Sequence, residues 1–311
     1  MKPDFSVLIP ARNEGGRIAL TIQSAARARA TGARVEFIVV DDASTDDCID
    51  SFSAAAPRLL KEKRIDIRVC RLEQHSGTYH ARNTAASLAS ADILFMTDAH
   101  VRFCRGWDEK VLEHIRPNRI LAGTITQEGS TFKGYGCSLM VPLMGTSWQR
   151  TPFEGIREVP IAVCAATALP RSLFENLGGY DEGMIHYGGG EPEFSVRAWL
   201  HGAEICSVPD LEVQHEFKPR QQLGLFLEGI RARWVHNCLR FGLLYLSELG
   251  GTQLLRFHAL KFPKVFAQAL SMIDDSDIWE RRTQLEQSRK HSFEWFVHAF
   301  ALRNQIGGEI I

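Results

Sequence analysis

Asp98 and His100 are the residues of this sequence best suited to hold a metal ion. They stand two positions apart directly after the apolar run Asp92-Ile-Leu-Phe-Met96, so in an extended chain both side chains can point toward one ion. A carboxylate oxygen and an imidazole nitrogen suit manganese or a similar divalent metal. Such a metal would hold a diphosphate and neutralise the charge that grows on it as it leaves. The alternative is that Asp98 caps a helix and His100 is an ordinary surface histidine.

Two earlier apolar runs also end in polar residues. Ser6-Val-Leu-Ile9 leads to Glu14, and Glu36-Phe-Ile-Val-Val40 leads to Asp42. Nearly continuous apolar runs are typical of parallel strands that helices cover on both faces. In such a sheet the ligand lies beyond the carboxyl ends of the strands, which are side by side. The residues expected to converge on this crevice are Glu14, Asp42, Asp98 and His100.

Helical patterns separate these strands. Ile18 to Arg29 and Ala81 to Leu88 carry Ala, Leu and Arg at helical spacing, and Ser44 to Asp47 offers cap residues for a further helix. The alternation predicts βα units and a Rossmann-like nucleotide-binding half. From Gly123 to Gly190 the chain is rich in Gly, Pro and aromatic residues, with irregular stretches that compact domains keep mainly for binding and catalysis. We expect the acceptor site there.

The last third of the chain is predicted to be helical. After His215, helices are expected over Leu223 to Leu246, Leu254 to Met272 and Asp277 to Leu302, the last capped by Ser276 or Asp277. We therefore predict a catalytic domain over residues 1–218 and a helical extension over residues 219–311. The extension would serve as a lid, contact the acceptor or join two chains in a homodimer.

Composition excludes several classes of protein. The 311 residues are 45% hydrophobic and 23% charged, as in a globular chain. With 36 basic against 37 acidic residues the net charge is −1, so no nucleic-acid partner is expected. Seven cysteines without a CxxC pair fit a reducing compartment. The N-terminus is too short and acidic for a secretory signal, and no apolar run reaches the roughly 20 residues of a membrane span. We expect a cytoplasmic protein without a transmembrane segment.

Several segments together resemble the family 2 glycosyltransferases with the GT-A fold: Ser6 to Glu14, Val39 to Asp46, Ala81 to Asn83 and Thr97 to His100. Others are similar to the polypeptide N-acetylgalactosaminyltransferases: Asp98-Ala-His100 in place of Asp-x-Asp, Gly106-Trp107, Gly179 to Met184, Tyr187 to Gly189 and Val213 to Phe217. The resemblance covers residues 5 to about 218. It implies an α/β GT-A fold with a mixed central sheet and a UDP-sugar donor.

The resemblance also implies roles for individual residues. Asp42 would bind uracil, and Asp98 would take part in binding both the nucleotide and a Mn²⁺ or Mg²⁺ ion. Further residues of the uridine pocket would be Pro10, Arg12, Glu14 and Arg82. The other metal ligands would be His100 and His215. Contacts to the donor or acceptor sugar are expected from Tyr187, Gly189, Gly190 and Glu193.

Glu191 is the main departure from the pattern of the N-acetylgalactosaminyl group. Aligned on Ser195 and Arg197, it falls where inverting family 2 enzymes have their catalytic aspartate and the retaining group has asparagine, while Gly190 replaces the usual glutamate. A carboxylate here can accept the proton of the acceptor hydroxyl during attack on the anomeric carbon. We therefore predict inversion with Glu191 as general base. The alternative is that Glu191 binds a sugar hydroxyl or caps a helix beginning near Pro192.

Other functions remain as competing hypotheses. One is retaining transfer to a peptide or protein hydroxyl, a second is a sugar nucleotidyltransferase, and a third is a non-catalytic module that binds a sugar nucleotide. A nucleotidyltransferase normally has a Gly-rich phosphate loop after the first strand, where this chain has Pro10-Ala-Arg-Asn-Glu14. An NAD-dependent dehydrogenase is disfavoured because no GxGxxG follows that strand. The acceptor classes to consider are a glycan, a peptide, a lipid-linked sugar or a small molecule.

Overall fold

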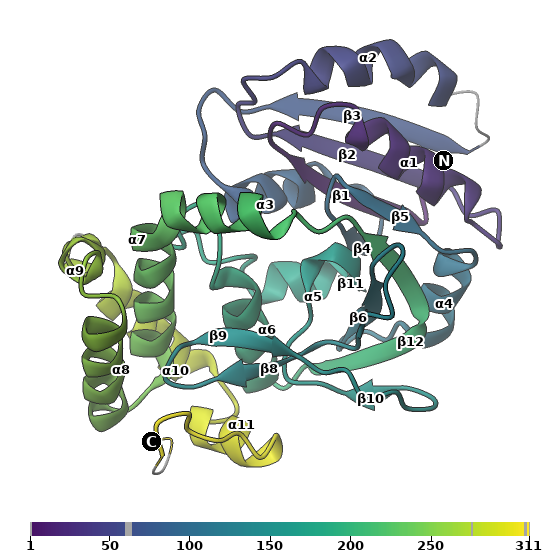
Figure 1. The fold of residues 1–311 in the computed structure, drawn as a ribbon. Helices are drawn as coiled ribbons and strands as arrows, with labels where there is room; N and C mark the ends of the chain where they lie inside the picture. Colours follow the sequence, from purple (N-terminus) through teal and green to yellow (C-terminus); the bar gives the residue numbers. More distant parts are fainter. Residues whose placement is uncertain (1, 60–63, 275, 308–309, 311) are drawn as a thin grey trace.

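A mixed β-sheet forms the centre of the protein (Figure 1). The computed structural model describes residues 2–59, 64–274, 276–307 and 310. The strands of the large sheet are β1 (Phe5–Ala11), β2 (Val35–Asp41), β3 (Ile65–Arg71), β4 (Ile93–Met96), β5 (Val101–Phe103), β6 (Arg119–Thr126), β7 (Lys133–Gly134), β10 (Arg157–Glu158), β11 (Thr167–Pro170) and β12 (Glu204–His215). Their order is β10-β12-β6-β11-β4-β1-β2-β3, with β5 paired to β12 and β7 to β6. A separate hairpin pairs β8 (Cys137–Met140) with β9 (Gly145–Trp148).

The N-terminal half of the sheet is parallel. β1 lies between β2 and β4 and runs parallel to both, and β3 extends the arrangement beyond β2. β1, β2 and β4 are almost completely buried, as their apolar sequences predict. β11 is antiparallel to both β4 and β6, so the sheet is mixed. The predicted strands and the predicted mixed sheet are therefore confirmed.

Helices connect and cover these strands. In the catalytic part they are α1 (Arg17–Arg27), α2 (Cys48–Leu59), α3 (Thr78–Leu88), α4 (Trp107–His114), α5 (Arg171–Asn176), α6 (Gly190–Leu200) and the short 3₁₀ helix η1 (Cys164–Ala166). α2 begins where expected, because the Asp46 side chain accepts a hydrogen bond from the Cys48 amide at 3.1 Å. α3 packs on β1 and β2, which places its residues near the carboxyl ends of these strands.

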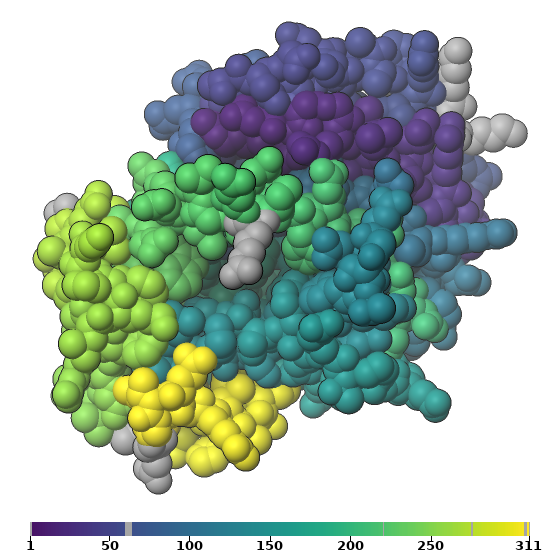
Figure 2. All heavy atoms as spheres, in the orientation of Figure 1, coloured from purple at the N-terminus to yellow at the C-terminus, as the bar shows by residue number. Residues whose placement is uncertain are grey.

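The C-terminal part is helical, as predicted. It contains α7 (Arg220–Tyr245), α8 (Glu248–Lys261), α9 (Phe266–Asp274), α10 (Ile278–Ser288) and α11 (Phe293–Ala299). α8, α9 and α10 pack on α7, while α7 and α11 both contact α6. Figure 2 shows the purple-to-blue N-terminal third, the green α7 and the yellow C-terminal segment as parts of one continuous body. No helix within the described ranges is both long enough and apolar enough to cross a membrane.

Two of the predicted C-terminal helices are interrupted. The helix expected over Leu254 to Met272 stops at Lys261, because Pro263 lacks an amide hydrogen and restricts the residue before it. The helix expected over Asp277 to Leu302 is divided at residues 289–292. There the Lys290 and His291 amides donate to the Leu200 carbonyl oxygen, and the Ser292 side chain caps α11. In both places a local break allows the chain to pack on another element.

Candidate active site

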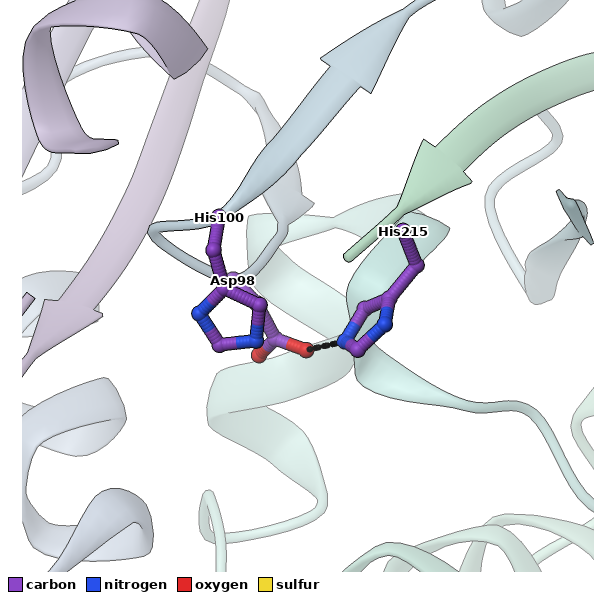
Figure 3. A group of neighbouring side chains, drawn as sticks. All are labelled: Asp98, His100 and His215. Carbon is purple, nitrogen blue, oxygen red and sulfur yellow. Dashed lines mark ion pairs between the residues drawn. The ribbon is translucent and has the colours of Figure 1, made fainter. Parts of the chain in front are cut away.

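The pairing of β12 with β5 brings together the three predicted metal ligands. His215, the last residue of β12, pairs with Val101 of β5, so it lies beside His100 and close to Asp98 (Figure 3). Asp98 Oδ2 is 3.3 Å from His215 Nε2, and the two imidazole rings are 4.8 Å apart. One ligand atom from each of the three residues lies within 4.8 Å of the others. One carboxylate and two imidazoles form a donor set that suits Mn²⁺.

Hydrogen bonds around this group favour metal binding. His100 Nδ1 is 3.1 Å from Glu14 Oε2. A carboxylate on one ring nitrogen fixes the tautomer of a metal-binding histidine and leaves the other nitrogen for the ion. The buried Nδ1 atom of His215 has no hydrogen-bond partner among the described residues. The arrangement therefore fits a divalent ion.

The charges of the site keep Asp98 ionised. Burial opposes ionisation, but the hydrogen bond from His215 and the positive charge of Arg82 outweigh it and hold the pKa of Asp98 well below its ordinary value. Burial also lowers the pKa of His100, whereas the hydrogen bond to Glu14 and the charge of Asp98 raise it more, so the net pKa lies above its ordinary value. Bound metal would replace the proton that these acids favour on the imidazole.

Arg82 links the candidate metal site to the predicted base. It comes from α3 and is only 1% exposed. Its guanidinium nitrogens lie 2.9 Å from Asp98 Oδ1 and 3.3 Å from Glu191 Oε1. Glu14 and Arg82 were both predicted for the uridine pocket, and the structure gives both of them contacts to the metal-site residues. Arg82 fixes the spacing of two carboxylates that would otherwise repel each other.

Glu191 lies in the first turn of α6, and its side chain is 30% exposed. The thiol and the backbone amide of Cys164 also hydrogen-bond to its carboxylate. Burial raises the pKa of Glu191, and the charge of Asp98 adds to this effect; Arg82 and Cys164 oppose it, but the net pKa is raised. A partly exposed carboxylate with a raised pKa is suited to accept a proton near neutral pH.

Asp42 lies directly after β2, as predicted, and the loop between β3 and α3 surrounds its carboxylate. The backbone amides of Ser76 and Gly77 donate to it at 2.7 and 2.9 Å, and His75 Nδ1 is 2.7 Å away. Arg12 donates to the carbonyl oxygens of Asp42 and Ala43, so it joins two loops of the predicted pocket. Pro10 is half-buried near the end of β1.

The residues predicted to contact sugar have unequal access. Tyr187 is 47% exposed beside the site. Glu193, in contrast, is fully buried: its carboxylate accepts two hydrogen bonds from Arg197 at 2.8 Å and one from Tyr245 at 2.7 Å. The prediction that Glu193 contacts sugar is therefore wrong, because both of its oxygens are used inside the protein. Gly189 and Gly190 are tightly packed, as described below.

Sequence reasoning missed His75. Its carboxylate contact and its ring contact with His186, with centroids 4.0 Å apart, place it at the predicted uridine pocket. The available signal was its position two residues before Gly77 and six residues before Ala81, where the predicted helix begins. A groove of about 200 Å³ runs beside His100 and His215 and is also lined by Phe217.

Comparisons with known proteins agree with this geometry. Residues 6–178 match the model of glycosyl transferase family 2. Polypeptide N-acetylgalactosaminyltransferase 6 of Mus musculus is 26% identical over an alignment that covers 95% of this chain and 49% of the relative. Polypeptide N-acetylgalactosaminyltransferase 8 of Drosophila melanogaster is 30% identical over an alignment that covers 70% of this chain and 38% of the relative.

A solved structure shows the same fold. The crystal structure of GalNAc-T7 with UDP, GalNAc and Mn²⁺ superposes with a TM-score of 0.76 at 22% identity, covering 96% of this chain and 57% of that one. This chain spans about half or less of the length of the two N-acetylgalactosaminyltransferases from Mus musculus and Drosophila melanogaster. Both the family and the fold expected from the motifs are confirmed. The chain belongs to glycosyl transferase family 2 and has the GT-A fold.

Proposed function

We propose that this protein is a metal-dependent glycosyltransferase that moves a sugar from a UDP-sugar to an acceptor hydroxyl with inversion of configuration. The observation that carries the proposal is the group of Asp98, His100 and His215 linked through Arg82 to Glu191. A metal site and a carboxylate base held at the same crevice are the parts that such a reaction needs. The GalNAc-T7 structure with UDP, GalNAc and Mn²⁺ supports the choice of donor and metal.

Each part of the crevice has a role in this proposal. Asp98, His100 and His215 would hold Mn²⁺ or Mg²⁺, which when bound supplies positive charge for the leaving diphosphate. Asp42 and His75, with the nearby Pro10, would line the uridine end. Arg82 would keep Asp98 and Glu191 apart at a fixed spacing.

Glu191 would take the proton from the acceptor hydroxyl. Its raised pKa brings its basicity closer to that of a base working near neutral pH. Its partial exposure leaves one side open to an acceptor.

Retaining transfer to a peptide or protein hydroxyl is the second candidate. The ion pair between Arg82 and Glu191 favours it, because a neighbouring positive charge reduces the basicity of a carboxylate. The similarity to polypeptide N-acetylgalactosaminyltransferases favours it as well.

The stereochemistry of the product tests the proposal. A screen of UDP-sugars that measures UDP release identifies the donor, and NMR then gives the anomeric configuration of the product. We expect an inverted product, and a retained configuration contradicts the role of Glu191. Glu191→Gln should keep binding of UDP with manganese but lower turnover by about 10²–10⁴-fold. Glu175→Gln, at an exposed position of α5, is the matched control and should be fully active.

Binding of UDP tests the nucleotide and metal sites separately from catalysis. UDP with manganese should raise the unfolding temperature more than UDP alone, because a ligand that binds only the folded state stabilises it. If neither UDP nor any UDP-sugar changes the unfolding temperature, the proposal is refuted. A cytoplasmic location and a homodimer through the C-terminal helices stay predictions.

A further inference from the structure

The loop that leads into Glu191 is held by a side chain of the C-terminal helices. Asn237, on α7, is completely buried. Its Oδ1 atom accepts a hydrogen bond from the Ile185 amide at 2.8 Å. Its Nδ2 atom donates to the carbonyl oxygens of Ile185, Tyr187 and Gly188 at 2.9, 3.3 and 2.6 Å. One side chain thus satisfies four backbone groups of a loop that has no regular structure of its own.

Close packing presses the same loop between α7 and α3. A Cβ atom at Gly188 would lie 2.3 Å from Trp234, and one at Gly189 would lie 2.9 Å from Asn237. A Cβ atom at Gly190 would lie 2.5 Å from the ring of Tyr79. Gly188 and Gly189 also have φ values of +87° and +84°, which residues with a side chain rarely adopt. The three glycines therefore allow the backbone to approach both helices.

The position of this loop decides the position of the proposed base. Gly190 begins α6, and Glu191 is the next residue. A general base must lie within hydrogen-bond reach of the proton that it accepts, and a misplacement of about 1 Å can cost about 100-fold in rate. Arg82 and Cys164 fix the carboxylate end of Glu191. The backbone end is held by the contacts from α7, together with the packing of Gly190 on Tyr79 and the hydrogen bond from the Thr78 amide to the His186 carbonyl oxygen on the α3 side.

We propose that Asn237 is a positioning residue, through which α7 of the C-terminal extension sets the place of Glu191. Asn237 does not act on the substrate; it anchors residues 185–188 so that α6 starts at a fixed point. This inference rests on the proposed function, because it assigns a purpose to the extension only if Glu191 is the base. It predicts that loss of Asn237 impairs turnover far more than it weakens binding of UDP with manganese.

A double-mutant cycle between Asn237 and Glu191 tests the proposal. Asn237→Ala should lower kcat about 100-fold, an effect much larger than any change in affinity for UDP with manganese. In the Glu191→Gln background the same change should have almost no further effect on kcat. Glutamine cannot act as the base, so a shift in its position cannot remove any further base catalysis. Cys238→Ala is the matched control: Cys238 is the next residue of α7 and is equally buried, and its variant should stay active.

A second variant guards against a folding defect. Asn237→Asp keeps the shape of the side chain and the acceptor for the Ile185 amide but cannot donate to the three carbonyl oxygens. It should reproduce the fall in kcat while the protein still binds UDP with manganese. Hydrogen exchange of the amides in residues 185–190 should become faster in both Asn237 variants and stay unchanged in Cys238→Ala.

The outcomes separate this inference from the proposed function. If Glu191→Gln is impaired and Asn237→Ala multiplies that loss by its full effect, the two residues act independently and the inference is overturned while the base role stands. Full activity of Asn237→Asp also overturns it. If Glu191→Gln keeps normal turnover, the proposed base and the inference that depends on it both fail.

Discussion

Replacing Tyr245 by phenylalanine should destabilise the protein by a predictable amount. Tyr245, at the end of α7, donates a hydrogen bond to Glu193 Oε1 at 2.7 Å, and both residues are buried. Burial and the adjacent carboxylate raise the pKa of Tyr245 well above its ordinary value, so the hydroxyl stays protonated and donates. Phenylalanine would keep the ring contacts with Phe241 and Phe293. The change therefore removes one hydrogen bond and little else.

The size of the effect follows from the charge and burial of the acceptor. A hydrogen bond to a charged group typically contributes about 1.5–3 kcal/mol to the free energy of unfolding. When the donor is removed and the acceptor stays buried, water does not replace the donor and this whole contribution is lost. Glu193 would keep its two hydrogen bonds from Arg197, so the carboxylate would remain paired. We expect a loss of about 1.5–3 kcal/mol in the free energy of unfolding. At roughly 2 °C per kcal/mol for a chain of this size, Tm should fall by about 3–6 °C.

Urea unfolding followed by circular dichroism measures this loss. The m-value should stay the same, because the surface exposed on unfolding does not change. Tyr135→Phe is the matched control: its ring is also buried, but its hydroxyl has no hydrogen-bond partner among the residues that the structure describes. That variant should change the free energy of unfolding by less than about 0.5 kcal/mol. A loss in Tyr245→Phe no larger than in the control would refute the argument that this bond joins α7 to α6.

Three further predictions concern the metal site and pH. Asp98→Ala should abolish the extra thermal stabilisation that manganese gives in the presence of UDP; a persisting manganese effect would count against Asp98 as a ligand. Glu14→Gln should weaken manganese binding about tenfold or more, since the carboxylate that orients His100 is lost; an unchanged affinity in a thermal-shift titration would contradict this. Burial and the nearby charge of His75 lower the pKa of His186 from 6.5 to about 4. The unfolded chain therefore takes up a proton in this window that the folded chain does not, and stability falls as pH falls from 6.5 toward 4. His186→Asn, which tolerates the φ of 56° at this position, should lose less stability than the parent protein between pH 7 and pH 5; an equal loss in both proteins would show that His186 is not the cause.

Most of the nucleotide-binding half could be predicted from the sequence. Buried parallel strands such as β1 and β2 are continuous apolar runs, and their polar ends are read directly from the sequence. β3 was harder to predict, because this outer strand alternates polar and apolar residues and is partly exposed. The breaks after Lys261 and Ser288 were missed, since each depends partly on packing that helical periodicity does not describe.

The sequence by itself determined which residue types follow each strand. The apolar runs predict parallel strands, whose carboxyl ends lie at one edge of the sheet, and this places Asp42, Asp98 and His100 at that edge. The order β4-β1-β2 of these strands is seen only in the fold. The family and the fold follow from the same local motifs.

Only the tertiary structure decided the contacts between distant segments. The pairing of β12 with β5 places His215 beside His100, and α7 brings Asn237 to the loop of residues 185–188 that leads into Glu191. Glu191 and Glu193 differ in burial, which the sequence does not show. Glu193 is buried and paired inside the protein, whereas Glu191, two positions earlier, is partly exposed at the crevice. Local periodicity specifies which face of an element is buried but does not specify which distant element covers it, so these contacts become visible only when the chain is folded.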